Sequence, residues 1–174
     1  MSGCEKLIDA GRRQFLRGGA VVAAGGLAVS GAPAVAQQAR PAAARVDYPT
    51  QRLANINQLK PNEPLPIAYP DRDSPGVLLK LGTRVENGAG PDGDIVAFST
   101  VCPHQGFPLT YKPGDKTLTC PGHYSRFDCE RAGQQVHGQA TQNLAQFTLR
   151  IDASGDIFAE GADELIYGRL SNVL

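Results

Sequence analysis

The chain has 174 residues, 41% of them hydrophobic, with 17 basic and 17 acidic side chains. This length allows one domain with a substantial core and is too short for a two-domain enzyme. Residues 1–36 hold four of the basic and two of the acidic residues, so the remainder of the chain has 13 basic and 15 acidic residues. It therefore lacks the excess of basic residues that nucleic-acid-binding proteins need. Twenty glycines and 13 prolines, with no tryptophan, favour a turn-rich β architecture.

The N-terminus resembles a twin-arginine export signal. Arg12-Arg13 is followed by a weakly hydrophobic run at 18–35 and by a small-x-small cleavage site at 34–36. We therefore expect residues 1–36 to be a signal peptide that directs the chain to the periplasm, by a route that generally carries folded, cofactor-loaded proteins. The alternative is that 18–35 is kept as a membrane anchor, which its high glycine content disfavours. Membrane association is expected only in that case.

Short strands broken by turns are expected to form the domain at 51–174, which follows an Ala-, Gln- and Pro-rich tether at 37–50. Four prolines limit residues 59–70 to loop or edge strand. Two compact apolar runs follow, at 76–82 and 94–100, and a loop rich in glycine and proline separates them. This pattern predicts a β-hairpin.

A second hairpin is predicted near the C-terminus. Alternating apolar positions at 146–152 and 156–161 flank Ala153-Ser154-Gly155, a suitable turn. A short helix is expected at 163–170. Together these elements predict an all-β fold, a small antiparallel β domain with cysteine- and histidine-containing loops inserted between its strands.

Those loops hold a matched set of metal-binding side chains. Cys102-x-His104 is followed, after fifteen intervening residues, by Cys120-x2-His123. Four such ligands could close a tetrahedron around one structural zinc ion, but zinc ligands within a loop are usually two to four residues apart. Two loops with the same Cys-then-His order suit a two-metal cluster better, because each loop can give a thiolate to one iron and an imidazole to the other. Neutral imidazoles in place of two thiolates raise the reduction potential of such a cluster.

The two loops resemble the cluster-binding motif of the Rieske family, over about residues 97–149. Further positions follow the family order, namely Ser125, Asp128, Gly133, Gly138 and Leu144. The resemblance implies a Rieske-type antiparallel β domain with an inserted cluster-binding subdomain at about 97–140. It also implies that one 2Fe–2S cluster is held by Cys102 and Cys120 on its inner iron and by His104 and His123 on its solvent-facing iron.

The residues around the four cluster ligands follow the family motif only in part. The resemblance implies that Ser125 donates a hydrogen bond to a bridging sulfide, and that Gly122 lets backbone N–H groups come close to the sulfurs. Phe107 and Gly122 stand where quinol-oxidising members have a disulfide, and Phe127 replaces a tyrosine that donates to a cluster thiolate. The shielding loop Gly-Pro-Ala-Pro is GQAT at 138–141. We expect a potential in the lower half of the Rieske range.

The remaining cysteines and histidine have simpler interpretations. Cys4 lies in the signal and is expected to leave with it. Cys129 has no second free cysteine to pair with in the mature chain, so it is interpreted as a buried small hydrophobic residue. His137 is interpreted as a surface turn residue, with a contact to a partner near the cluster as its functional alternative.

No catalytic residue is expected on this chain. A Rieske oxygenase needs a mononuclear iron site of two histidines and a carboxylate, and only His137 is free for it. The strings CPHQGFPL and CPGHYSRFD resemble the small subunit of arsenite oxidase, a periplasmic electron carrier. That resemblance implies a large molybdopterin catalytic subunit as one partner and a cytochrome c or small copper protein as electron acceptor. The alternatives are the Rieske subunit of a quinol-oxidising cytochrome bc-type complex and a structural zinc-binding module.

Overall fold

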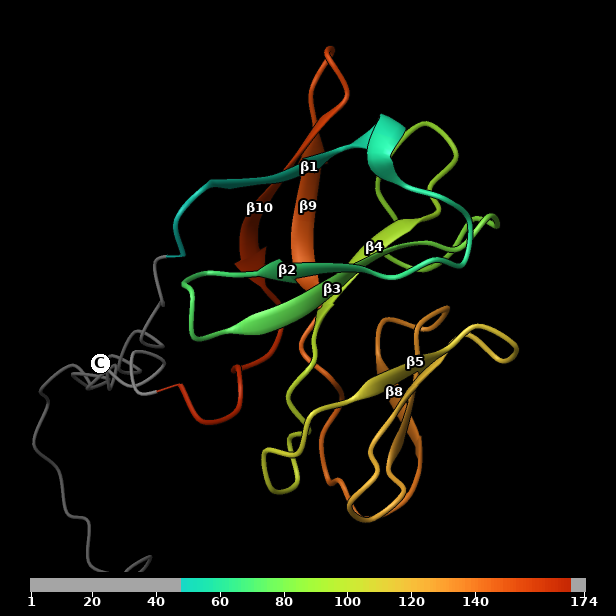
Figure 1. The fold of residues 1–174 in the computed structure, drawn as a ribbon, viewed down its shortest axis with the longest axis vertical. Helices are drawn as coiled ribbons and strands as arrows, with labels where there is room; N and C mark the ends of the chain where they lie inside the picture. The colour runs from blue at the N-terminus through green and yellow to red at the C-terminus, as the bar shows by residue number, and fades with distance from the viewer. Residues whose placement is uncertain (1–47, 170–174) are drawn as a thin grey trace, which may run out of the picture. The chain divides into compact units, whose positions relative to one another are not determined.

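The computed structural model describes residues 48–169, so the twin-arginine segment and all but the end of the tether lie outside the described part. Within it, the chain forms three antiparallel sheets (Figure 1). The elements are β1 (Gln51–Asn55), η1 (Ile56–Gln58), β2 (Leu65–Ala68), β3 (Pro75–Lys80), β4 (Ile95–Ser99), β5 (Thr110–Lys112), β6 (Thr117–Thr119), β7 (Arg126–Asp128), β8 (Gln134–His137), β9 (Phe147–Ile151) and β10 (Asp156–Ala162).

Two of the sheets build the base of the domain and confirm both predicted hairpins. β2, β3 and β4 form one sheet in that order, and β1, β10 and β9 form the other. Every residue of β4 is buried, as its continuous apolar sequence indicates, because the strand is covered on both faces. The base core contains Tyr69, Leu78, Phe147 and Ile157.

The proline-rich segment 59–70 lies at a sheet edge, as predicted. It contains β2, which pairs with β3 and is the outer strand of its sheet. Pro66 lies within β2 opposite Val77. Proline has no backbone N–H to donate, so within a sheet it fits an edge strand.

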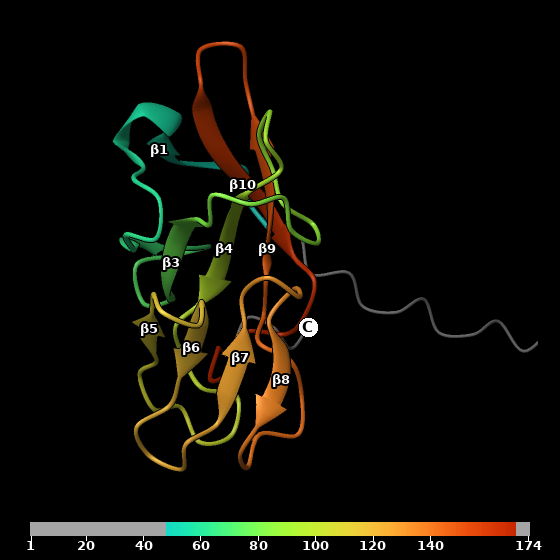
Figure 2. The same cartoon turned by 90° about the vertical axis from the view of Figure 1, so that its right-hand side faces the viewer.

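The third sheet, in the order β5-β6-β7-β8, is the inserted subdomain (Figure 2). It sits on a second core, in which Phe98 from β4 is clustered with Leu118, Phe127 and Leu144. Because this core continues from the base into the insert, the two metal-ligand loops are attached to a packed foundation. The described residues 48–169 contain no helix long and apolar enough to cross a membrane.

The prediction of a short helix at 163–170 is wrong for the described residues 163–169, which form bends and a turn. Tertiary contacts determine this segment. The Asp163 carboxylate accepts a hydrogen bond from the backbone N–H of Gln146, and Arg169 forms an ion pair with Asp71. Gly168 has φ +74°, which is outside the right-handed helical region.

Candidate metal centre

The two loops that carry the cysteines and histidines fold alike. In loop 1 (residues 102–107, between β4 and β5) the N–H of Cys102 donates to the carbonyl of Phe107, and the N–H of Gly106 donates to the carbonyl of Cys102, both at 2.8 Å. Loop 2 (residues 120–125, between β6 and β7) repeats both hydrogen bonds at the same spacing, from Cys120 to Ser125 at 2.8 Å and from Tyr124 to Cys120 at 3.1 Å. The matched sequence pattern therefore gives a matched backbone.

The fifth residue of each loop confirms this equivalence. Gly106 has φ +75° and Tyr124 has φ +58°, so both loops turn through the left-handed region at the same position. Such a conformation is unusual for tyrosine and is stabilised only where the surrounding structure requires it. The two loops thus share the same backbone turn, with the histidine third in loop 1 and fourth in loop 2.

The two cysteines meet inside the protein. Cys102 and Cys120 are 0% and 1% exposed. Burial raises the pKa of the Cys102 thiol and the adjacent Cys120 thiol adds to the effect, whereas hydrogen bonds from the backbone N–H groups of His104 and Gln105 lower it. The same N–H groups would stabilise a thiolate, the form in which cysteine binds metal.

The two histidines meet nearer the surface. The ring centroids of His104 and His123 are 4.8 Å apart with an interplanar angle of 80°. His104 is half-buried and His123 is exposed, so one imidazole edge reaches solvent. The structure therefore places the two sulfurs inside the protein and the two imidazoles nearer the surface.

A buried nitrogen of His104 shows that these residues fit a metal. Its Nδ1 is inaccessible to solvent and has no hydrogen-bond partner among the described residues. An unpaired buried nitrogen is costly, and native structures rarely contain one without a bound ligand or water. A metal ion would accept the lone pair of this nitrogen.

The donors form two pairs, the buried Cys102 and Cys120 and the outer His104 and His123. Among residues 48–169, no three Cys, His, Asp or Glu side chains converge closely enough to hold one ion. A structural zinc site needs four ligands around one point. A two-iron cluster needs only two protein ligands on each iron, because inorganic sulfide supplies the rest.

Ser125 is held with its hydroxyl proton available. Its side chain is fully buried, and its Oγ accepts hydrogen bonds of 3.0 Å from the backbone N–H groups of Gln139 and Ala140. With two donors on the oxygen, the hydroxyl proton is left to donate elsewhere, as the motif implies. These two N–H groups could not be anticipated from the sequence, since no feature of GQAT marks them as donors to a residue 14 and 15 positions earlier.

Phe107 and Gly122, which stand at the disulfide positions of the motif, are in contact. A Cβ atom added to Gly122 would lie 3.0 Å from the Phe107 ring. The ring also meets His123 edge to face, with centroids 5.8 Å apart at 89°. An aromatic ring packed on a glycine thus joins the two loops here.

The other candidates lie where the sequence suggested or close to it. Cys129 is 0% exposed and part of the insert core, and burial raises the pKa of its thiol to about 12, so it is an unreactive small hydrophobic residue. His137 is exposed but ends strand β8 opposite Arg126, where a turn had been expected. Tyr167, which drew no attention in the sequence, lies against loop 1: a Cβ on Gly106 would be 2.9 Å from its ring.

Comparison with known proteins assigns the fold and the motif together. The family model described as "Rieske [2Fe-2S] domain" matches residues 50–148. Iodate reductase subunit IdrB of Denitromonas iodatirespirans is 40% identical over 165 residues, which cover 92% of this chain and 85% of the relative. The cytochrome bc1 complex Rieske iron-sulfur subunit of Corynebacterium efficiens is 36% identical over 70 residues, 40% of this chain and 17% of the relative.

A solved structure agrees with these relatives. The soluble domain of Rieske protein II (soxF) from Sulfolobus acidocaldarius superposes with a TM-score of 0.64 at 27% identity, covering 70% of this chain and 82% of that one. The family match, at residues 50–148, includes the inserted subdomain with its two loops.

Proposed function

The chain belongs to the Rieske [2Fe-2S] family, and from this premise we propose that it is the electron-transfer subunit of an exported oxidoreductase acting on an inorganic oxyanion. As a family member it binds a Rieske-type 2Fe–2S cluster, and it is not a structural zinc module. The cluster supplies one-electron oxidation and reduction when bound. The protein contributes the position, the surroundings and the solvent contact of the cluster.

We assign the ligands from the paired loops. Cys102 and Cys120 hold the inner iron in the buried half of the site, and His104 and His123 hold the outer iron. Ser125 directs its hydroxyl toward a sulfide. Because His123 is the exposed imidazole, electrons enter and leave on its side.

The length of chain over which the relatives match indicates which kind of oxidoreductase this subunit serves. Identity with the iodate reductase subunit runs over 92% of this chain, far outside the two cluster loops. Identity with the bc1 Rieske subunit is confined to 70 residues, and the cysteines of the disulfide found in quinol-oxidising members are replaced by Phe107 and Gly122. These observations favour a small subunit of the iodate reductase or arsenite oxidase kind over a bc-type subunit, and of the two substrates we propose iodate.

The proposal requires a larger catalytic partner, which we infer to be a molybdopterin subunit. The test is affinity purification of the tagged chain from its native host, with molybdenum analysis of any large polypeptide that copurifies. The complex is then assayed for iodate reduction with a reduced dye and for arsenite-dependent reduction of a cytochrome c or small copper protein. Iodate reduction by the complex supports the proposal. Arsenite oxidation without iodate reduction would show that the substrate is arsenite, and a copurifying cytochrome b would establish the bc-type alternative.

Export is a separate proposal that rests on the N-terminal sequence. We expect Arg12→Lys with Arg13→Lys to keep the chain in the cytoplasm, because the charge is retained while the twin-arginine pair is lost. Cell fractionation with N-terminal sequencing measures this. Cluster-loaded protein of the variant in the periplasm would show that the signal has been misidentified. Wild-type chain with an intact N-terminus in the membrane fraction would establish a retained anchor.

Restoring the disulfide should change cluster retention more than potential. Gly122 is not among the residues of 48–169 with positive φ, and Phe107→Cys removes the ring that a Gly122 Cβ would meet, so the double variant Phe107→Cys with Gly122→Cys is sterically reasonable. Closing a loop of about 15 residues adds roughly 3 kcal/mol on chain-entropy grounds. Loss of visible absorbance in guanidinium should therefore need more denaturant under oxidising conditions, with dithiothreitol-reduced variant as control. An unchanged midpoint would mean that no bond forms.

Replacing Phe127 by tyrosine should raise the reduction potential. Phe127 is completely buried in β7, in the same core cluster as Cys102 and Cys120. A hydroxyl donating to a cluster thiolate is favoured in the reduced state, which carries one more negative charge. If about 1 kcal/mol of such a bond differs between the two states, the potential rises by about 40 mV. Protein-film voltammetry measures this, and a fall or no shift would mean that position 127 does not face a thiolate.

A further inference from the structure

The segment that follows β10, residues 163–169, returns to loop 1 of the metal centre. We call this segment the strap. It contains no helix or strand, so its path is set by the contacts that it makes with the rest of the domain. Asp163, Ile166 and Arg169 hold it to the base, and Tyr167 lies against loop 1.

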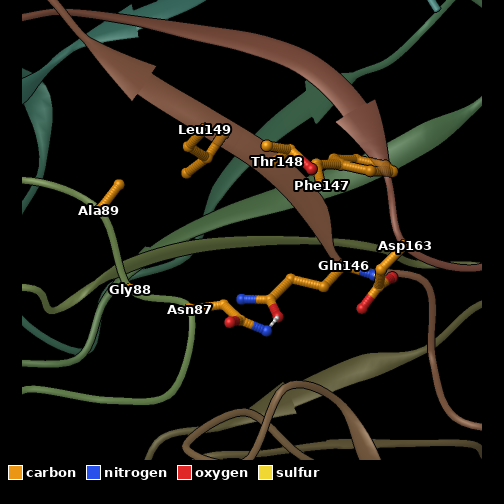
Figure 3. A pocket seen from close by; sticks show the side chains of 8 residues that line it. All are labelled: Asn87, Gly88, Ala89, Gln146, Phe147, Thr148, Leu149 and Asp163. Carbon is orange, nitrogen blue, oxygen red and sulfur yellow. Dashed lines mark hydrogen bonds between the residues drawn. The ribbon is translucent and has the colours of Figure 1, made fainter.

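Asp163 fixes the start of the strap against β9. The backbone N–H of Gln146 donates to Asp163 Oδ1 at 2.7 Å, and the backbone N–H of Asp163 donates to the carbonyl of Gln146 at 3.1 Å. Both residues line a pocket of about 440 Å³ beside β9, and Figure 3 shows them next to each other at the start of that strand. Two reciprocal hydrogen bonds determine both the position and the direction of the chain at this end.

Arg169 fixes the other end of the strap. Its Nε donates to Asp71 Oδ2 at 2.9 Å, and its side chain is only 16% exposed. The guanidinium carbon also lies 5.7 Å from the centre of the Tyr48 ring. Asp71 is itself held in place, because its Oδ1 accepts a hydrogen bond of 2.8 Å from the Ser74 hydroxyl. A partly buried ion pair of this kind is less screened by salt than a fully exposed one.

Between these two ends, the strap covers the residue that closes loop 1. Ile166 is 2% exposed and belongs to the base core. A Cβ atom on Gly106 would lie 2.9 Å from Cε1 and 3.5 Å from Cδ1 of Tyr167, so the tyrosine ring fills the space that a side chain at 106 would take. The N–H of Gly106 donates to the carbonyl of Cys102 at 2.8 Å, and this hydrogen bond closes the loop.

Loop 2 is covered less at the equivalent position. Tyr124 closes that loop with the same hydrogen bond, and its side chain is 69% exposed. The two histidines differ in the same sense, because His104 is half-buried and His123 is exposed. The strap therefore lies on the loop whose histidine is the less exposed of the two.

The position of the Tyr167 ring depends on the two ends of the strap. A cavity of about 370 Å³ lies between the strap and the turn that contains Asp71 and Ser74, and it reaches Val101, the residue before Cys102. Solvent can occupy a cavity of this size. Since the strap is not fully packed here, loss of either end should allow Tyr167 to leave loop 1.

We propose that Tyr167 is a positioning residue for the cluster, which the strap holds on Gly106 so that loop 1 stays closed and the His104 side of the site stays less hydrated than the His123 side. Water stabilises charge, and the reduced cluster carries one more negative charge than the oxidised cluster. Exclusion of water by Tyr167 therefore lowers the reduction potential. The inference rests on the ligand assignment within the proposed function and requires no particular catalytic partner.

Hydrogen–deuterium exchange on the cluster-loaded full chain tests whether Tyr167 keeps loop 1 closed. We expect Tyr167→Ala to speed exchange of the Gly106 amide at least tenfold, and to leave the Tyr124 amide of loop 2 within twofold of wild type. Tyr167→Phe keeps the ring and should match wild type. Leu165→Ala is the matched control from the same segment, because that side chain is 57% exposed, and it should also match wild type.

Protein-film voltammetry provides the second measurement. Tyr167→Ala should raise the midpoint potential, and Arg169→Gln, which releases the strap without changing a residue on loop 1, should shift it in the same direction. The double variant should shift it by less than the sum of the two, because each change releases the same contact. If Tyr167→Ala does not retain the cluster, Arg169→Gln carries both predictions.

Three results would overturn the inference. They are wild-type exchange of Gly106 in Tyr167→Ala, equally accelerated exchange in both loops, and a potential that falls or does not move. None of them affects the ligand assignment, which the EPR signal of His104→Ala decides separately.

Discussion

Replacing His104 with alanine is expected to abolish the rhombic Rieske EPR signal. The imidazole is half-buried and its Nδ1 is inaccessible, with no hydrogen-bond partner in the described part of the chain. Its ring lies 4.8 Å from that of His123, the only other imidazole at the centre, so no histidine from 48–169 could take its place. With one protein ligand left on the outer iron, the cluster should not be retained.

Two measurements separate ligand loss from general damage. His137→Ala is the matched control, because that histidine is exposed and ends β8 opposite Arg126, outside both loops, and the EPR signal of this variant should be unchanged. Since the twin-arginine route favours folded cargo, export of His104→Ala should also fall. A variant that kept an unaltered rhombic signal would contradict the ligand assignment.

The second large effect is expected for Gly138→Ala. A Cβ at this position would lie 2.4 Å from Cα and 2.6 Å from the backbone nitrogen of Ser125, and Gly138 has φ +95°. Backbone atoms cannot yield as a flexible side chain can. Strain at such a φ costs about 1–3 kcal/mol and overpacking costs about as much again. We expect destabilisation of about 3 kcal/mol, which lowers Tm by roughly 10 °C.

This variant should also disturb the cluster through Ser125. Displacing its backbone would misalign the hydroxyl that Gln139 and Ala140 hold, so the reduction potential should fall along with the stability. Gly114→Ala is the control, since a Cβ there has no neighbour within 4 Å. If calorimetry and voltammetry gave the same values for Gly138→Ala as for this control, the close approach of 138 to 125 would be wrong.

Local patterns were sufficient to predict the two hairpins of the base, but not β1 or its pairing with β10. The two hairpins follow from continuous or alternating apolar runs joined by turns rich in glycine, because burial of one or both faces of a strand imposes that pattern directly. The insert sheet was not predicted strand by strand. β5, β6 and β7 have three residues each, which is too short for an alternating apolar pattern to be recognised in the sequence.

The helix expected at 163–170 failed for a related reason. A local propensity is a weak determinant when side chains find distant partners. Arg169 pairs with Asp71 nearly one hundred positions away, and Asp163 binds the backbone of Gln146. Both contacts depend on where the rest of the chain has already folded.

The sequence alone determined the fold class, the four candidate cluster ligands and the family motif around them, because ligand type and spacing within a short loop are local properties of the chain. The tertiary structure decided how the loops are joined and what surrounds them. Phe107 packs on Gly122, Ser125 receives the N–H groups of 139 and 140, and Gln146 is left with a buried, unused donor. Each of these depends on contacts between segments far apart in the chain, and no spacing or periodicity in the sequence records such contacts.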